Sequence, residues 1–223
     1  MLSDNSLKKL ETFFSSYKPL RFKRREIVLY ADEQVTNIFY IRSGYVRVYR
    51  ISELGEELTI TILKPLDLFP ISWGIDHTPN PYYLEAITSL EVYRVSQAQF
   101  LRYIRSQPDT FYELASKMLA RFDRLLTRME YLVTGRAYTK VASIILVCAA
   151  SFGQKQGANV VLSIPLTHRD IAALVGITRE TTCLEMKKLE KKGLISHLGR
   201  QLIVKDLKKL EEESAFLGEG TAF

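Results

Sequence analysis

The chain of 223 residues has few side chains suited to covalent chemistry or metal binding. Its two cysteines, Cys148 and Cys183, are far apart and lack the spacing of a metal-binding pair. So few thiols, without a disulfide pattern, are typical of a protein kept in a reduced cytoplasmic environment. We therefore expect no metal ion, no cofactor and a cytoplasmic location.

Histidine is also scarce, and its distribution argues against an enzyme. A metal-dependent barrel of the cupin type needs clustered histidines together with a carboxylate. Of the three histidines, His168 and His197 belong to the carboxy-terminal part, so only His77 remains for the rest of the chain. No nucleophile–base motif or phosphate-binding loop occurs either. The enzymatic alternative, a cupin-type metalloenzyme, therefore lacks its ligands, and we expect no enzymatic activity.

Long hydrophobic segments are missing as well. The longest apolar run, residues 141–152, is too short to span a bilayer. The first residues lack the pattern of a signal peptide. We therefore expect no membrane partner.

What the chain has in excess is positive charge near its carboxy terminus. The net charge is +6 and the pI is about 9.2. Residues 168–209 hold ten lysines and arginines against five acidic residues, an excess of +5. Such a concentration favours double-stranded DNA as a partner. For the stretch KKLEKK alone, a solvated helix face is the alternative.

Hydrophobic spacing divides the chain into regions of different structure. Four apolar residues between 7 and 17 have helical spacing after Ser3, which predicts a short opening helix. From about residue 20 to 95 the pattern alternates with period two between turn residues, which predicts a small antiparallel roll. We place a sensing domain at 1–107, a long helix at 108–134 and a further domain at 135–223.

The long helix carries two apolar stripes. The first has heptad spacing and consists of Phe111, Ala115, Met118, Phe122, Leu125, Met129 and Leu132. The second lies on a neighbouring face and consists of Tyr112, Leu119, Leu126 and Val133. Either the helix is buried inside one domain, or one stripe packs on the roll and the other on the same helix of a partner chain. The regular heptads favour this homodimer, with Gly135 as a hinge after the helix.

Residues 167–195 have the pattern of two helices that meet at a steep angle. Thr167 is a helix-capping residue, and Gly176 accepts the positive φ of a tight turn. Ala172 is small enough for the second helix, which Thr178 caps, to approach closely. The inner face of the second helix consists of Thr182, Met186 and Leu189. This pattern predicts a helix-turn-helix, and a helical hairpin without nucleic-acid function is the alternative.

The next stretch, GLISHLGRQLIV, predicts two short strands that turn near Gly199, with Arg200 at the tip, as in a winged helix-turn-helix. Together with TRETTCLEMKKLEKKGLI, VTGR and FYIRSGYVRVYR, it makes the chain similar to the cyclic-AMP receptor protein / fumarate-nitrate regulator (CRP/FNR) family of bacterial transcription factors. The resemblance implies an α+β fold with an amino-terminal cyclic-nucleotide-binding-like β-roll, a long dimerisation helix and a carboxy-terminal winged helix-turn-helix.

The same resemblance implies a homodimeric, sequence-specific regulator of transcription. We expect its operator to be an inverted repeat and its partners to be DNA and RNA polymerase. We expect an effector of unknown identity, bound in the roll, to control it. A ligand-sensing scaffold whose helix-turn-helix binds protein is the remaining alternative.

The resemblance also assigns DNA contacts. Arg179 and Glu180 occupy base-reading positions, where arginine bonds guanine and glutamate accepts from cytosine. Cys183 falls where some members have a small polar side chain that reads a base. Leu184 stands where most members have a second arginine, and leucine suits a thymine methyl group instead. The implied phosphate contacts are Thr167, Arg169, Thr181, Lys187, Lys188 and Arg200.

The sensor region departs from the family pattern. Where cyclic-nucleotide members have a Gly-Glu and an Arg-Ser pair, this chain has Pro70 and Ile71, and Asn80 and Pro81. A buried phosphate needs a cation and donors, so we expect an effector other than cyclic AMP or GMP. No amino-terminal cysteine cluster for iron–sulfur binding is present, and a lone His77 is a weak basis for haem. The remaining candidates fill the core or line an apolar effector pocket: Phe69, Trp73, Tyr82, Tyr83 and Tyr93.

Overall fold

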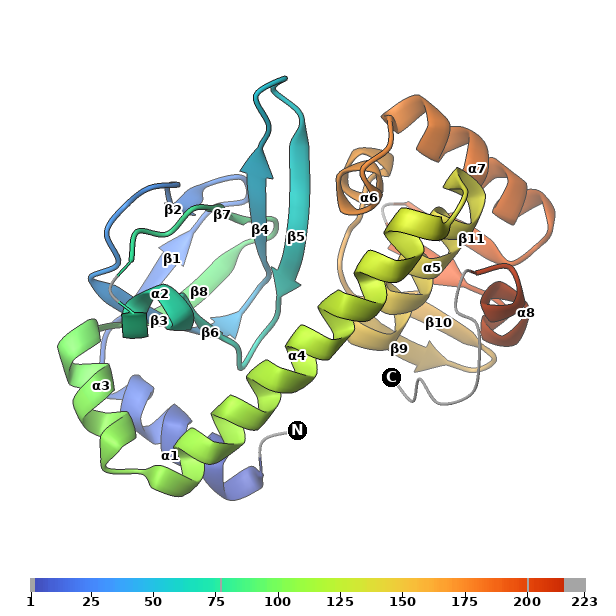
Figure 1. Cartoon of the computed structure of the whole chain (residues 1–223). Coiled ribbons are helices and arrows are strands. Elements are labelled where there is room, and N and C mark those ends of the chain that lie inside the picture. The colour runs from blue at the N-terminus through green and yellow to red at the C-terminus, as the bar shows by residue number, and fades with distance from the viewer. Residues whose placement is uncertain (1–2, 77, 200, 215–223) are drawn as a thin grey trace. The chain divides into compact units, whose positions relative to one another are not determined.

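A computed structural model describes residues 3–76, 78–199 and 201–214 of the chain (Figure 1). The chain divides into two compact units, Met1–Arg124 and Leu125–Phe223. The first unit contains a strand-rich roll with helices, and the second contains a small sheet surrounded by helices. The predicted order of roll, long helix and helix-turn-helix is therefore confirmed.

The roll consists of two four-stranded antiparallel sheets. Their strand orders are β1-β8-β3-β6 and β2-β7-β4-β5. The strands are β1 (Pro19–Phe22), β2 (Ile27–Leu29), β3 (Asn37–Ser43), β4 (Val46–Ile51), β5 (Glu57–Leu63), β6 (Leu68–Phe69), β7 (Tyr83–Ala86) and β8 (Leu90–Ser96). Residues of both sheets form one apolar core, to which Val46 and Val48 of β4 contribute. The antiparallel roll predicted for about residues 20–95 is therefore confirmed.

A second core lies where helices cover the roll. It joins Ile38, Tyr40 and Val95 of the first sheet to side chains of three helices. These are α1 (Asp4–Ser15), α3 (Gln97–Arg105) and α4 (Pro108–Thr134). The opening helix begins as predicted, because the Ser3 side chain accepts a hydrogen bond from the Ser6 amide at 3.2 Å. The sequence pattern missed α3 and the short helix α2 (Ile71–Asp76).

The face of α4 that contacts the roll belongs to neither apolar stripe and consists of other residues. Leu114 is buried in the second core, while Lys117 and Arg121 bind the carboxylate of Asp67 at 2.8 and 2.9 Å. The expectation that one stripe packs on the roll is therefore wrong.

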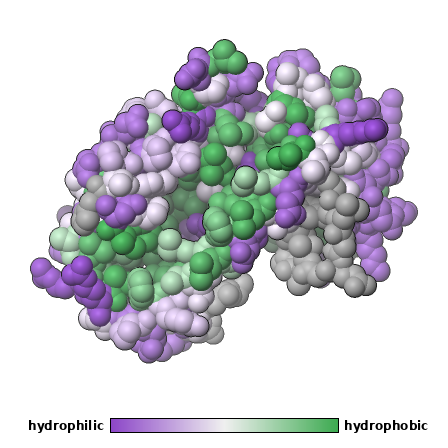
Figure 2. Space-filling view, viewed as in Figure 1, coloured by the Kyte–Doolittle hydropathy of each residue, from purple (hydrophilic) through white to green (hydrophobic). Residues whose placement is uncertain are grey.

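Most residues of both apolar stripes of α4 are exposed instead, while Ala115, Leu125 and Leu132 are half-buried. The exposed fraction lies between 41% and 81% for Phe111, Tyr112, Met118, Leu119, Phe122, Leu126, Met129 and Val133. Figure 2 shows hydrophobic residues gathered along this helix. The alternative of a helix buried inside one domain is therefore wrong as well. Among the described residues, no helix has the length and apolar character needed to cross a membrane.

The second unit is built around an antiparallel sheet with the order β11-β12-β10-β9. Its elements are α5 (Ala137–Phe152), β9 (Gly153–Gln156), β10 (Asn159–Leu162), α6 (His168–Val175), α7 (Arg179–Lys191), β11 (Ile195–Leu198), β12 (Gln201–Val204) and α8 (Leu207–Glu212). The polar stretch GQKQGAN covers residues 153–159. It contains strand β9 and a turn at Gly157, where φ is +62°.

Candidate nucleic-acid interface

Helices α6 and α7 meet at a turn that depends on Gly176. This residue has φ 68° and ψ 40°, the left-handed conformation in which a Cβ atom is disfavoured. The amides of Gly176 and Ile177 both donate to the Ala172 carbonyl, at 2.9 and 3.3 Å. The turn therefore ends α6 within two residues and lets α7 start in a new direction, as the sequence predicted.

A capping box fixes the start of α6. The Asp170 amide donates to the Thr167 hydroxyl at 3.2 Å, and the Thr167 amide donates to the Asp170 carboxylate at 2.7 Å. The Thr167 hydroxyl also donates to this carboxylate, at 2.6 Å. Both donors of Thr167 are thus used by the cap, which gives this residue a role in positioning α6.

Threonines also organise the start of α7. The Thr178 hydroxyl accepts from the Thr181 amide at 3.1 Å and lies 2.9 Å from the Thr181 hydroxyl. The Thr182 hydroxyl donates to the Thr178 carbonyl at 3.0 Å and is fully buried. Met186 and Leu189 are buried behind it, so the predicted inner face of the helix is confirmed.

The opposite face of α7 collects the predicted base-contacting residues. Arg179 and Glu180 are exposed at its start, Cys183 is half-buried, and Leu184 is 60% exposed. Lys187 continues the same face one turn further. A single helix surface therefore presents cations, a carboxylate and one apolar side chain to solvent, which matches what a major groove offers.

Two charged side chains of α7 behave differently from the rest of this face. Glu185 is buried, with a relative exposure of 9%, and its carboxylate accepts a hydrogen bond from Lys188 at 2.9 Å. Lys188 is therefore partly neutralised, unlike its neighbour Lys187. The sequence reasoning missed Glu185, because its four-residue spacing from Leu189 is also the spacing of ordinary surface charges.

The wing is present as a hairpin of β11 and β12. Ile195 pairs with Val204 and Leu198 with Gln201, and Gly199 has φ +60° in the turn. The predicted phosphate contact Arg200 lies outside the described residues. Arg169 is exposed on α6 and Thr181 is half-buried on α7.

A half-buried arginine of α4 contacts the helix-turn-helix. The Arg128 guanidinium donates to the Leu174 carbonyl at the end of α6, and Tyr131 is buried beside it. Burial lowers the pKa of Arg128 and raises that of Tyr131. Burial also raises the pKa of the nearby Cys148 thiol to about 12, so this cysteine is protonated and unreactive. The compact second unit thus includes the last part of α4, before Gly135.

The structure distributes the predicted effector residues among several environments. Phe69 stacks on Phe39 in the core between the sheets, with ring centroids 5.2 Å apart. Trp73 packs against Tyr82, with ring centroids 5.5 Å apart. Tyr93 packs against the second core, whereas Tyr83 stacks on Tyr49 at 5.4 Å. Phe69 and Tyr82 thus belong to the core between the sheets, whereas Trp73 and Tyr93 pack against the second core.

Asn80, at the position of the predicted clamp, holds the surrounding loop together through hydrogen bonds. Asn80 is fully buried, and its amide group donates to the carbonyls of Tyr30 and Tyr82 at 3.1 and 2.6 Å. Its carbonyl accepts from the Tyr82 amide at 3.2 Å. His77 lies outside the described residues. In the described part of the chain, no group of three or more His, Cys, Asp or Glu side chains is placed to hold a metal ion.

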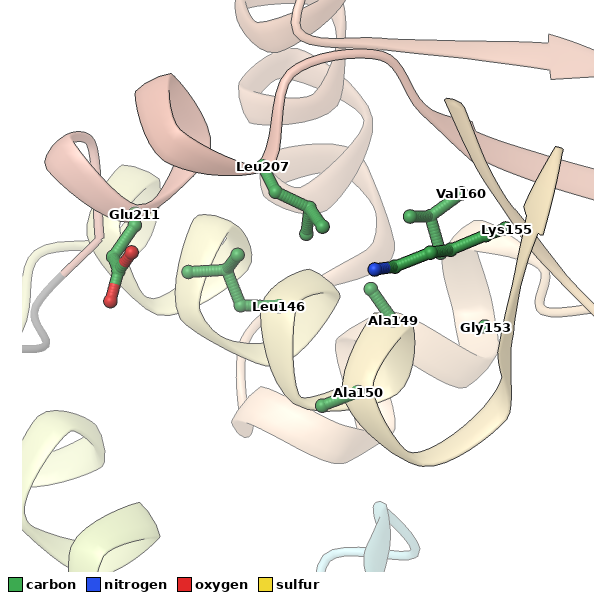
Figure 3. A pocket seen from close by; sticks show the side chains of 8 residues that line it. All are labelled: Leu146, Ala149, Ala150, Gly153, Lys155, Val160, Leu207 and Glu211. Atoms are coloured by element: carbon green, nitrogen blue, oxygen red, sulfur yellow. The ribbon is translucent and has the colours of Figure 1, made fainter. Parts of the chain in front are cut away.

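A cavity of about 370 Å³ lies elsewhere in the second unit (Figure 3). Its lining comes from α5, β9, β10 and α8, and consists of Leu146, Ala149, Ala150, Gly153, Lys155, Val160, Leu207 and Glu211. No residue of α6 or α7 takes part, so this cavity is separate from the candidate DNA surface.

Comparisons with known proteins match both units. Residues 19–107 match the cyclic nucleotide-binding domain, and residues 139–213 match the Crp-like helix-turn-helix domain. A CRP-like cAMP-activated global transcriptional regulator of Mycobacterium tuberculosis is 25% identical over 193 residues, or 86% of each chain.

Solved structures share the fold. FixK2 from Bradyrhizobium japonicum superposes with a TM-score of 0.78 at 20% identity, covering 91% of this chain and 99% of that one. A CooA variant from Carboxydothermus hydrogenoformans gives 0.76 at 23% identity, covering 95% and 97%. The comparisons support neither a protein-binding scaffold nor a cupin-type metalloenzyme.

Proposed function

Because this chain belongs to the CRP/FNR family of DNA-binding transcription regulators, we propose that it acts as a homodimer on an inverted-repeat operator. The observation that carries the proposal is the exposed face of α7, where Arg179, Glu180, Leu184 and Lys187 lie together beyond the Gly176 turn. We assign the protein a regulatory role in the cytoplasm and no enzymatic activity.

The base contacts follow from the chemistry of this face. Arg179 donates two hydrogen bonds to O6 and N7 of a guanine, and Glu180 accepts from N4 of a cytosine. Leu184 has no donor and is suited to the methyl group of a thymine. Cys183 contributes a small side chain between them. The half-site therefore differs from one read by a second arginine.

Phosphate contacts hold the domain in register without specifying sequence. Arg169 and Lys187 are exposed cations on the two helices. Arg200, which lies outside the described residues, is proposed as a further phosphate contact. Thr167 and Thr181 act through the caps that position α6 and α7. Lys188 shares its charge with Glu185 and contributes less than Lys187.

The homodimer forms through α4. Its two exposed apolar stripes provide a continuous surface for the same helix of a second copy, as in a coiled coil. Two copies related by a twofold axis place their α7 helices in major grooves about 34 Å apart. The operator must then be an inverted repeat, because the two half-sites are read in opposite directions.

In this proposal the roll, residues 1–107, is the sensing domain. Residues 108–134 form the dimerisation helix, and residues 135–223 form the DNA-binding domain. The Mycobacterium tuberculosis relative is described as cAMP-activated. Here Ile71 and the buried Asn80 stand at the clamp positions, so the proposed effector is not a cyclic nucleotide. RNA polymerase is the proposed protein partner, by analogy with the family.

Selection of binding sites from random duplex DNA by the full-length protein tests the proposal. We expect an enriched inverted repeat with half-site centres one helical turn apart. Arg179→Ala should relax the preference at one guanine position. The matched control, Lys155→Ala on β9, removes a charge outside α6 and α7 and should select the same repeat. A monomeric protein that enriches no sequence would contradict the proposal.

A further inference from the structure

Two histidines meet in the winged helix-turn-helix, although none of the contacts proposed above uses them. His168 is the first residue of α6 and is half-buried, and His197 is exposed on β11. Their rings meet edge to face with centroids 5.9 Å apart. Nδ1 of His197 lies 2.7 Å from the carboxylate of Glu190 on α7. Because a carboxylate only accepts, Nδ1 carries a proton, and the His197 ring is held against His168.

The surroundings of His168 disfavour a second positive charge. Burial lowers its pKa, and His197 on β11 lowers it further. Arg179 and Lys187 of α7 act in the same direction, while Glu190 of α7 opposes them. In the free protein, the protonated form of this imidazole is therefore less populated than that of an ordinary histidine at the same pH.

The position of His168 makes this balance sensitive to DNA. Its neighbour Arg169 in α6 is placed at the phosphate backbone in the proposed complex, and its other neighbour, Thr167, caps the helix. Asp170, the carboxylate of α6 itself, is bound to Thr167 in the capping box. A DNA phosphate brought to this end of α6 adds negative charge where cations predominate. It thereby stabilises the imidazolium form that the free domain disfavours.

We propose that His168, with His197 against it, takes up a proton when the domain binds DNA and then contacts a backbone phosphate. By linkage, a proton taken up on binding makes DNA affinity rise as the pH falls through the range in which histidine titrates. The inference rests on the proposed function, because it requires DNA at the face formed by α6 and α7.

The test compares dissociation constants of the full-length protein for the selected duplex at about pH 7.5 and about pH 6, at one ionic strength. We expect binding to be about three- to tenfold tighter at the lower pH, as uptake of up to one proton allows. His168→Gln should abolish this difference, and His197→Gln should reduce it. His77→Gln, which removes the third histidine of the chain, is the matched control and should keep the difference.

Two further measurements make the outcomes separable. A duplex of unrelated sequence, bound at low salt, should show the same pH dependence, because phosphates are common to all DNA. The imidazole resonance of His168 should titrate at a higher pH in the DNA complex than in the free protein, which tests the proton uptake without any substitution. Equal affinity at both pH values, with an unchanged titration, would overturn this inference alone. Absence of DNA binding at either pH would overturn the proposed function and this inference together.

Discussion

At the scale of the residue, the carboxylate of Asp67 shows how a charge is kept inside the first unit. It is 2% exposed and binds Lys117, Arg121 and the Lys64 amide. Burial alone raises the pKa of Asp67, but the two cations and the hydrogen bonds outweigh burial and hold it below the ordinary value. Asp67 thus stabilises the fold in its ionised form.

We predict that Asp67→Asn lowers the free energy of unfolding by about 3 kcal/mol, since one partner of a buried ion pair is removed. A group with a depressed folded pKa stabilises above its unfolded pKa, and the contribution disappears as the pH falls. The loss should therefore be full at neutral pH and shrink below about pH 4. Urea unfolding at several pH values measures it. The same loss at all pH values would contradict the ionic explanation.

Other residues show which roles a sequence can reveal. The caps at Ser3, Thr167 and Thr178 were predictable, because their partners lie within three residues. Arg128 was not. A charged residue on a helix with heptad spacing normally faces solvent, and its partner, the Leu174 carbonyl, lies far away in the sequence. Leu114, Arg121 and Arg128 follow one another at seven-residue intervals and so lie on one face of the helix. This spacing was the only sign in the sequence that Arg128 faces inward.

At the scale of the element, the outer face of α7 combines charge with one leucine. An exposed Leu184 has no packing role in the described chain, so a substitution there tests DNA contact with little effect on folding. We predict that replacing the contacted thymine by uracil, which lacks the methyl group, weakens binding by about 0.8 kcal/mol, roughly fourfold. Leu184→Ala should remove the difference between the two duplexes. An unchanged preference for thymine in Leu184→Ala would exclude Leu184 as the contact.

The elements also differ in how far the sequence predicted them. The roll strands and α7 follow simple periodicities, and both were found. Strand β9 was missed because it is almost entirely polar and takes its order from pairing with β10. The aromatic residues of the sensor were grouped by proximity in sequence. Strand alternation sends Tyr83 to a different face from its buried neighbour Leu84, which a grouping by sequence does not consider.

At the scale of the whole molecule, dimerisation and DNA binding should be coupled. We predict that Phe122→Glu, which places a charge in the heptad stripe of α4, produces monomers. Affinity for the selected inverted repeat should fall about 100-fold, because the second half-site contact is no longer intramolecular. Sedimentation and DNA binding measured on the same sample check both effects.

The control for this prediction is Ser116→Glu, an exposed position of α4 outside both stripes. It should leave the mass and the affinity unchanged. A Phe122→Glu protein that stays dimeric would place the dimer contact elsewhere on the chain.

The bond between Arg128 and the Leu174 carbonyl has a mechanical consequence. The carbonyl lies two residues before the Gly176 turn, and the guanidinium moves with α4. An axial rotation of this end of α4 would either displace that corner or break the hydrogen bond between Arg128 and Leu174. In the proposed dimer, a rotation of the paired α4 helices would thus act directly on the corner between α6 and α7, without passing through Gly135.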